Sequence, residues 1–192
     1  MLQKLENRRV TELRARLDEA GSVFDFVVLS LDATARPGEA EHRDALRELF
    51  EDIHARAQEW HCKLVEQHPQ YAAYQPLDIR PDLTQARPQA LDIARIEELA
   101  RDDGPLYRAL IDPPHGSTLQ VADFREWREA LRLHADEGMQ VLDWVGNADH
   151  EPQRSTWSRY FDDGKEWWGI WCLTLYNPRR RTLSALAAST TD

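Results

Sequence analysis

Aromatic positions are densest in residues 155–176, which hold four of the seven tryptophans. In the middle of this stretch, Asp163 and Gly164 form the dipeptide typical of a type I′ turn, which needs positive φ at both central residues. The pattern predicts two β-strands joined at that turn, the second of them apolar on both faces. Residues 182–189 alternate well enough to form a third strand, although Ala and Leu also favour a short helix. We therefore expect an antiparallel β-meander over about residues 155–189.

A turn at this position fixes which side chains face each other across the predicted hairpin. Tyr160 would face Trp167, and Arg159 would face Trp168 in a cation–π contact. Gly169 would then lie within the second strand, where glycine weakens the ladder unless another group approaches closely. A neighbouring indole, or the backbone of a ligand or partner, would account for a glycine there.

Helical spacing of apolar residues predicts several amphipathic helices before the meander. They cover residues 2–20, 39–68, 89–101 and 123–145, with a shorter helical or extended piece at 106–111. Within 123–145, Gly138 either ends a first half of the helix or allows close packing. Asp123 and Glu126 have the spacing of a capping box at the start of the last long helix. Residues 23–31 are rich in β-branched and aromatic residues and predict a mostly buried strand. This order of elements predicts one α+β domain over residues 1–192, with the meander and the N-terminal strand packed against amphipathic helices.

Residues 69–88 contain four prolines and few helix signals. They predict a long ordered loop, with one turn of helix near residues 71–74. Loops of this length are uncommon in compact domains and are often functional. Tyrosine, leucine and isoleucine side chains give this loop enough apolar character to lie on the core.

The length of 192 residues suits one domain with a sizeable core. No apolar run approaches the roughly 18 residues of a membrane span, and the charged N-terminus lacks the apolar core of a signal peptide. We therefore expect a cytoplasmic protein without membrane contact. Cys62 and Cys172 fall in no metal-binding spacing, and we expect both to be reduced thiols.

The net charge of −10 is unevenly distributed along the chain. From residue 151 onward five acidic residues meet six basic ones, so the negative charge belongs to the helical part before it. An acidic surface repels phosphate backbones and attracts basic partners, which disfavours nucleic-acid binding. The acidity of the long helix serves either solubility or the docking of a basic protein.

The chain carries no recognised catalytic or metal-binding motif. His54, His61 and His68 recur every seven residues, which puts neighbours about 10 Å apart along a helix, too far for one metal ion. Residues 149–151 (Asp-His-Glu) form a loop cluster without a third element at a recognised spacing. A P-loop, a GxGxxG fingerprint and a nucleophile elbow are all absent from the sequence. We predict no catalytic residue, no metal site and no cofactor.

In size, acidity and its tryptophan-rich segment WSRYFDDGKEWWGIWCL, the chain resembles the immunity proteins of bacterial toxin–immunity pairs. This resemblance implies a protein-binding module that neutralises a toxin by covering its active site, with charge steering the association. Aromatic residues and arginine are the usual anchors of such interfaces. The predicted partner-binding residues are Trp167, Trp168 and Arg159 of the hairpin with Glu48 and Asp52 of the long helix.

The alternative is a small enzyme or ligand-binding protein. His134 lies near the apolar face of its predicted helix, where it is either a core histidine with a hydrogen-bond partner or a base beside a ligand. Trp171 belongs to the predicted central strand. A pocket lined by both residues, between the sheet and the loop 69–88, is the site that this alternative predicts.

Overall fold

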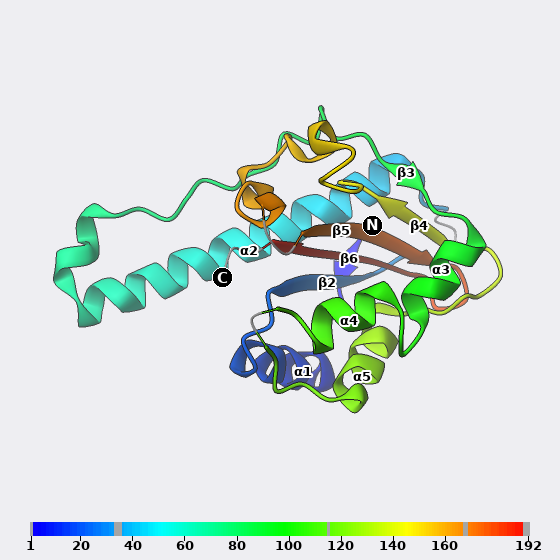
Figure 1. The fold of residues 1–192 in the computed structure, drawn as a ribbon, viewed down its shortest axis with the longest axis horizontal. Coiled ribbons are helices and arrows are strands. Elements are labelled where there is room, and N and C mark those ends of the chain that lie inside the picture. Colours follow the sequence, from blue (N-terminus) through cyan, green and yellow to red (C-terminus); the bar gives the residue numbers. More distant parts are fainter. Residues whose placement is uncertain (1, 33–35, 115, 167–168, 190–192) are drawn as a thin grey trace.

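The computed structural model describes residues 2–32, 36–114, 116–166 and 169–189. Its centre is a six-stranded antiparallel sheet with the strand order β1-β2-β6-β5-β4-β3 (Figure 1). The strands are β1 (Gln3–Lys4), β2 (Phe24–Ser30), β3 (Gln89–Ala90), β4 (Gln140–Asp143), β5 (Ile170–Asn177) and β6 (Thr182–Ser189). The long strands β2, β6 and β5 form the middle of the sheet, and the short strands lie outside them, with β1 and β3 at the two edges.

Helices cover both faces of this sheet (Figure 1). They are α1 (Arg8–Glu19), α2 (Glu39–Gln67), α3 (Ile93–Ala100), α4 (Pro105–Ile111) and α5 (Val121–Leu131). Within the described ranges, the remaining regular structure consists of four 3₁₀ helices: η1 (Pro69–Ala73), η2 (Pro152–Ser155), η3 (Arg159–Phe161) and η4 (Gly164–Glu166). Helix α2 packs on one face, and α1, α3, α4 and α5 pack on the other. The predicted α+β class is confirmed.

Alternation along the central strands builds two cores, one on each face. In β2, Phe26 joins the core under α1 and α5, whereas Val27 joins the core under α2. In β6, Ala185 and Ala187 face α2, and Leu186 faces the opposite core. Because successive side chains of a strand point to opposite faces, a strand covered on both sides is apolar throughout. The strands predicted at 23–31 and 182–189 are confirmed as β2 and β6.

The meander exists, but its members differ from the predicted ones. It consists of β4, β5 and β6, with β5 and β6 joined by residues 178–181. The first predicted strand, residues 155–162, is wrong, because η2 and η3 occupy this stretch. The predicted pairing of Tyr160 with Trp167 involves a residue outside the described ones, and the Tyr160 hydroxyl donates to Asp25 Oδ2 at 2.9 Å. Tertiary contacts therefore override the local turn signal.

Phe161 shows what this segment does instead of forming a strand. Its ring is fully buried, with its centroid 5.0 Å from that of Trp157 and 6.1 Å from that of Phe50 on α2. The segment thus closes the α2-side core with aromatic rings. The predicted contact of Arg159 with Trp168 lies partly outside the described residues, because residues 167–168 are not among them.

The predicted helix 123–145 is wrong in its second half. Helix α5 ends at Leu131, and Arg132 follows in the left-handed conformation with φ of 58°. The chain then forms β4, one of three short strands that the hydrophobic pattern did not reveal. Asp123 does cap this helix, but from its third position: its carboxylate accepts the Gln120 N–H at 2.8 Å.

The remaining helices agree more closely with prediction. Helix α2 matches residues 39–68, and α4 shows that residues 106–111 are helical. The predicted helix 2–20 is shorter at its start, because the Asn7 side chain accepts the Val10 N–H and begins α1 there. Residues 89–101 divide into β3 and α3. The expected turn of helix near 71–74 is η1.

Among the described residues, no helix is long and apolar enough to cross a membrane. Cys62 is exposed on α2, Cys172 is buried in β5, and both are free thiols.

Candidate functional site

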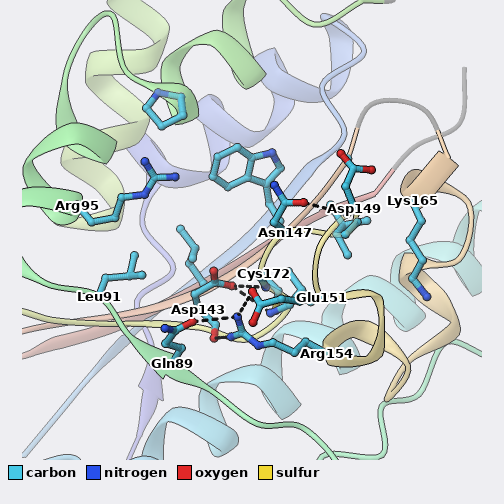
Figure 2. Close-up of a pocket in the computed structure, with 18 of the residues that line it drawn as sticks. Gln89, Leu91, Arg95, Asp143, Asn147, Asp149, Glu151, Arg154, Lys165 and Cys172 are labelled. Atoms are coloured by element: carbon cyan, nitrogen blue, oxygen red, sulfur yellow. Dashed lines mark hydrogen bonds and ion pairs between the residues drawn. The ribbon is translucent and has the colours of Figure 1, made fainter.

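A cavity of about 560 Å³ opens where β4 separates from β5 (Figure 2). Strand β5 pairs with β6 along its whole length, but with β4 only from Leu173 to Tyr176. In the described part of the chain, Ile170–Cys172 therefore has no strand on its β4 side. We call this opening the notch. Its main lining residues are Gln89, Leu91, Arg95, Asp143, Asn147, Asp149, Glu151, Arg154, Lys165 and residues 169–173.

A side-chain turn at the end of β4 keeps the notch open. Asp143 Oδ1 accepts the N–H groups of Val145 and Gly146 at 3.0 and 2.9 Å, which bends the chain away from β5. Gly146 adopts φ of 64°, a conformation that glycine reaches without strain. The buried Trp144 anchors the bend through its N–H bond of 3.0 Å to the Cys172 carbonyl. That bond is where the ladder between the two strands stops.

Arg154 ties three elements together on one wall of the notch. Its Nη1 donates to Glu151 Oε2 at 3.1 Å and to Gln89 Oε1 at 3.2 Å, and its Nη2 donates to the Asp143 carbonyl at 2.6 Å (Figure 2). The side chain is only 15% exposed. A Cβ at Gly146 would collide with the ends of the Arg154 and Glu151 side chains, which would then have to shift. Arg154 thus acts mainly as a clamp between β3, β4 and η2.

The rim of the notch carries both signs of charge. Arg95 forms an ion pair with Glu98 of its own helix, and Lys165 donates to Asp162 at 3.1 Å. Asp149 is exposed on the same rim (Figure 2). The positive side chains thus have acidic neighbours outside the notch. A mixed rim of this kind suits a polypeptide or a zwitterionic group better than a polyanion.

The described residues that line the notch include few side chains suited to act as a nucleophile or a general base. Burial raises the pKa of the Cys172 thiol well above its ordinary value, and the charge of Asp143 adds to this effect. The thiol is therefore protonated and a poor nucleophile at neutral pH. No histidine is found among the described residues that line the notch. The same part of the chain contains no group of three or more His, Cys, Asp or Glu residues able to hold a metal ion.

Gly169 lines the notch and directly precedes β5. Its φ of 106° lies in a region that residues with a side chain rarely adopt, and its N–H donates to the Gly164 carbonyl at 2.8 Å. A Cβ there would meet no described atom within 4 Å, its two chain neighbours aside. The need for glycine at this position is therefore conformational.

Of the predicted partner-binding residues, Glu48, Asp52 and Arg159 are described, and they are not among the residues that line the notch. Glu48 and Asp52 lie on α2, where Lys4 of β1 approaches them to 3.5 and 3.4 Å. Arg159 is exposed on η3. Trp167 and Trp168 lie outside the described residues. The structure thus brings Glu48 and Asp52 together, and places Arg159 on a separate element.

The two residues of the predicted ligand pocket are not brought together at the notch. Trp171 lines it and packs against Phe24 with a centroid distance of 6.4 Å. His134 follows α5, and its Nε2 lies 2.7 Å from Glu129 Oε2. Partial burial acts to raise the pKa of Glu129, but the His134 hydrogen bond and the nearby charges lower it overall. His134 therefore has the carboxylate neighbour that a base requires, in a half-exposed position and without lining the notch.

Sequence reasoning missed the residues that build the notch. Residues 149–151 were recognisable as a loop cluster. The structural roles of Asp143 and Arg154 could not be predicted, because they depend on where β4 pairs with β5. Because residues 140–143 were predicted to be helical, the pairing of β4 with β5 was not predicted either.

Comparison of the chain with models of known protein families and with curated proteins gives no match. What the notch does therefore has to be inferred from its own geometry.

Proposed function

We propose that this chain is a protein-binding module, and that the notch receives an extended segment of its partner. The observation that carries this proposal is the edge of β5 at Ile170–Cys172, which faces the notch instead of β4. An exposed strand edge binds extended peptides by adding them to the sheet. The partner segment would take the place that β4 leaves after Asp143.

The backbone direction of β5 fits this mode of binding. The Cys172 carbonyl accepts the Trp144 N–H, so it points toward the notch side. Because the backbone groups of an antiparallel strand point alternately to its two neighbours, Ile170 presents its N–H and C=O on this same side. A strand rises about 3.3 Å per residue, so the short open edge takes a segment of about three to five residues.

The charge of the chain favours a basic partner. The net charge is −10, and the exposed Asp149 and Glu151 stand on the notch rim. The positive charge of Arg154 is paired with the Glu151 carboxylate, and its other two acceptors are neutral. Long-range attraction would then bring a basic protein to this side of the molecule and raise its association rate. A toxin neutralised by steric cover of its active site is the specific partner that we propose.

A peptide selected from a displayed random library provides the first test. We expect the selected peptides to be extended and to carry a basic residue at a constant position. Methylating one backbone nitrogen at a time should abolish binding at alternate positions only, because only alternate N–H groups bond to β5. Sensitivity at every position, or at none, would contradict strand addition.

A matched pair of variants tests the charge contribution. Asp149→Asn and Glu137→Gln each remove one exposed negative charge, on the rim and after α5 respectively. We expect the first to weaken binding of a basic peptide several-fold and the second to leave it nearly unchanged. The toxin proposal adds a cellular test: the natural partner should be toxic when expressed alone and tolerated when this chain is co-expressed.

The notch also supports a second candidate function, the binding of a small molecule. A volume of about 560 Å³ lies within the usual range of ligand sites, roughly 300–1,000 Å³, and Trp171 offers an aromatic wall. Arg95 and Lys165 then serve a carboxylate or phosphate group of the ligand. A rise in melting temperature with small anions, combined with no peptide selected from the library, would favour this function over the first.

A further inference from the structure

Helix α2 extends far beyond the sheet (Figure 1). Its last buried residue is Ile53, and residues 54–67 continue for about 21 Å at 1.5 Å per residue. At the far end η1 reverses the chain, and residues 74–78 run back toward the sheet (Figure 1). We call residues 54–78 the arm. No residue of the arm is buried, so the core of this chain does not explain its shape.

The arm carries most of the large apolar side chains that the structure leaves in solvent. Of the six exposed ones among the described residues, four belong to the arm: Trp60, Tyr71, Tyr74 and Leu77. Trp60 and Tyr74 are 65% and 68% exposed, and the rings of Tyr71 and Tyr74 lie 6.1 Å apart. Apolar groups gathered on a projecting segment mark a contact surface rather than chance exposure.

The charges on the arm of one copy complement those on the arm of a second copy when the two helices run antiparallel. Along the helix Glu59 and Lys63 lie on either side of His61 at equal spacing and carry opposite charges. Two such helices aligned antiparallel about His61 would place each Glu59 opposite the Lys63 of the other copy. Within one chain these two residues already form an ion pair at 2.6 Å, and each side chain is 65% exposed, so both remain accessible.

The net charge of the chain also favours contact between the arms of two copies over contact between other surfaces. The chain carries −10, whereas the arm holds three acidic and two basic residues, so two copies repel each other least where their arms meet. An isologous contact uses the same patch on both subunits, which the antisymmetric charge pattern allows.

We propose that the arm binds the arm of a second copy of this chain, forming a two-fold symmetric dimer with Trp60 near its centre. In this dimer the antiparallel helices bury Trp60, Tyr71 of η1 and Tyr74. None of the residues that line the notch belongs to the arm, so the dimer leaves both notches open.

Light scattering on the full chain gives the first measurement. We expect a molar mass of twice 22.3 kDa at tens of micromolar protein. Replacing both Trp60 and Tyr74 by alanine should give a monomer with an unchanged melting temperature at high dilution, because both side chains are largely exposed. A wild-type chain that stays monomeric up to hundreds of micromolar would overturn the proposal. So would a double variant that still dimerises.

A mixing experiment tests the antiparallel alignment. Glu59→Lys leaves two positive charges at these positions in each copy, and Lys63→Glu leaves two negative ones, so we expect each variant to dimerise at least tenfold more weakly alone. An equimolar mixture should regain dimerisation, because unlike charges then meet. The control is Glu12→Lys, which reverses one member of an exposed ion pair on α1 and should change nothing. Absence of recovery in the mixture would contradict the alignment.

Cys62 allows the contact to be located directly. It is exposed on the arm, while Cys172 is buried, so a thiol-specific spin label modifies Cys62 alone. Because packed helices lie about 8–10 Å apart, the two labels of an arm-to-arm dimer should lie within about 30 Å of each other. A dimer with a longer label distance would use another surface and would refute this one.

Discussion

The two halves of α2 have the same hydrophobic pattern but different surroundings. Up to Ile53 its apolar stripe packs on β2 and β6, whereas the continuation through Ala57, Trp60 and Leu64 meets no core. A helix of 29 residues is about 43 Å long, and the longest strands, of eight residues, span about 26 Å. The helix therefore outruns the sheet that it covers. Periodicity predicts a helix, and the size of its partner decides how much of the helix is buried.

The largest expected difference between the two halves comes from leucine truncation. Leu49→Ala removes a fully buried side chain, and we expect it to lower the free energy of unfolding by about 2–5 kcal/mol. Leu64→Ala, on the half-exposed arm, should cost less than about 1 kcal/mol. Urea denaturation at a protein concentration low enough to keep the chain monomeric measures both. Equal costs would show that the arm is packed in solution.

His42 makes the packed half sensitive to pH. It is buried against the sheet, with Nδ1 2.7 Å from the Thr174 hydroxyl, and burial lowers its pKa to about 4 although Glu41 and Glu39 act in the opposite direction. The unfolded chain binds this proton near pH 6.5. Between these pH values the unfolded state holds more protons, so the free energy of unfolding falls as the pH falls.

The loss attributable to His42 should reach about 3 kcal/mol below pH 4. Other acidic groups titrate in the same range, so the informative quantity is the difference between wild type and His42→Leu. We expect the variant to lose less stability than wild type between pH 6.5 and pH 4, whatever its stability at neutral pH. Denaturation curves collected across this range provide the measurement, and parallel pH profiles would contradict a neutral buried histidine.

The comparison also shows how much of the fold could be predicted from the sequence. The long apolar runs of β2 and β6 and the stripe of α2 have strong periodic signals, and these elements were predicted correctly. Strand β4 has four residues, and its Val141 and Leu142 continued the helical spacing of α5. A stretch this short is defined by its pairing with β5 rather than by its own pattern.

The region around Asp163-Gly164 failed for a different reason. A dipeptide that favours a hairpin turn contributes little against the burial of Phe161 and the bond of Tyr160 to Asp25. The notch escaped prediction because it depends on where two strands part. Arg154, the clamp of the notch, donates a hydrogen bond to Gln89, which lies 65 positions earlier in the sequence. No local sequence motif can predict a contact over this separation.

Arg56 marks the boundary between the two halves of α2. Its guanidinium pairs with Asp25 of β2, which also accepts the Tyr160 hydroxyl. Burial raises the pKa of Asp25, while Arg56 and Tyr160 act to lower it. We expect Arg56→Ala to cost about 1–3 kcal/mol, since it leaves a mostly buried carboxylate without its cation. The double variant Arg56→Ala/Asp25→Asn should recover part of this loss in urea denaturation, and simple additivity of the two losses would argue against coupling.

The smallest effect on the free energy of unfolding is expected for Trp60, the exposed tryptophan of the arm. Trp60 is 65% exposed, so Trp60→Ala should change the free energy of unfolding of the monomer by less than about 0.5 kcal/mol, although tryptophan is the largest side chain. Trp127→Ala, which empties a fully buried site beneath α5, is the matched control and should cost about 3–5 kcal/mol. With rising protein concentration, wild type should gain stability over Trp60→Ala, because self-association stabilises only the folded chain. A concentration-independent difference would place the role of Trp60 within the monomer, and the arm would then belong to the packed part of the molecule.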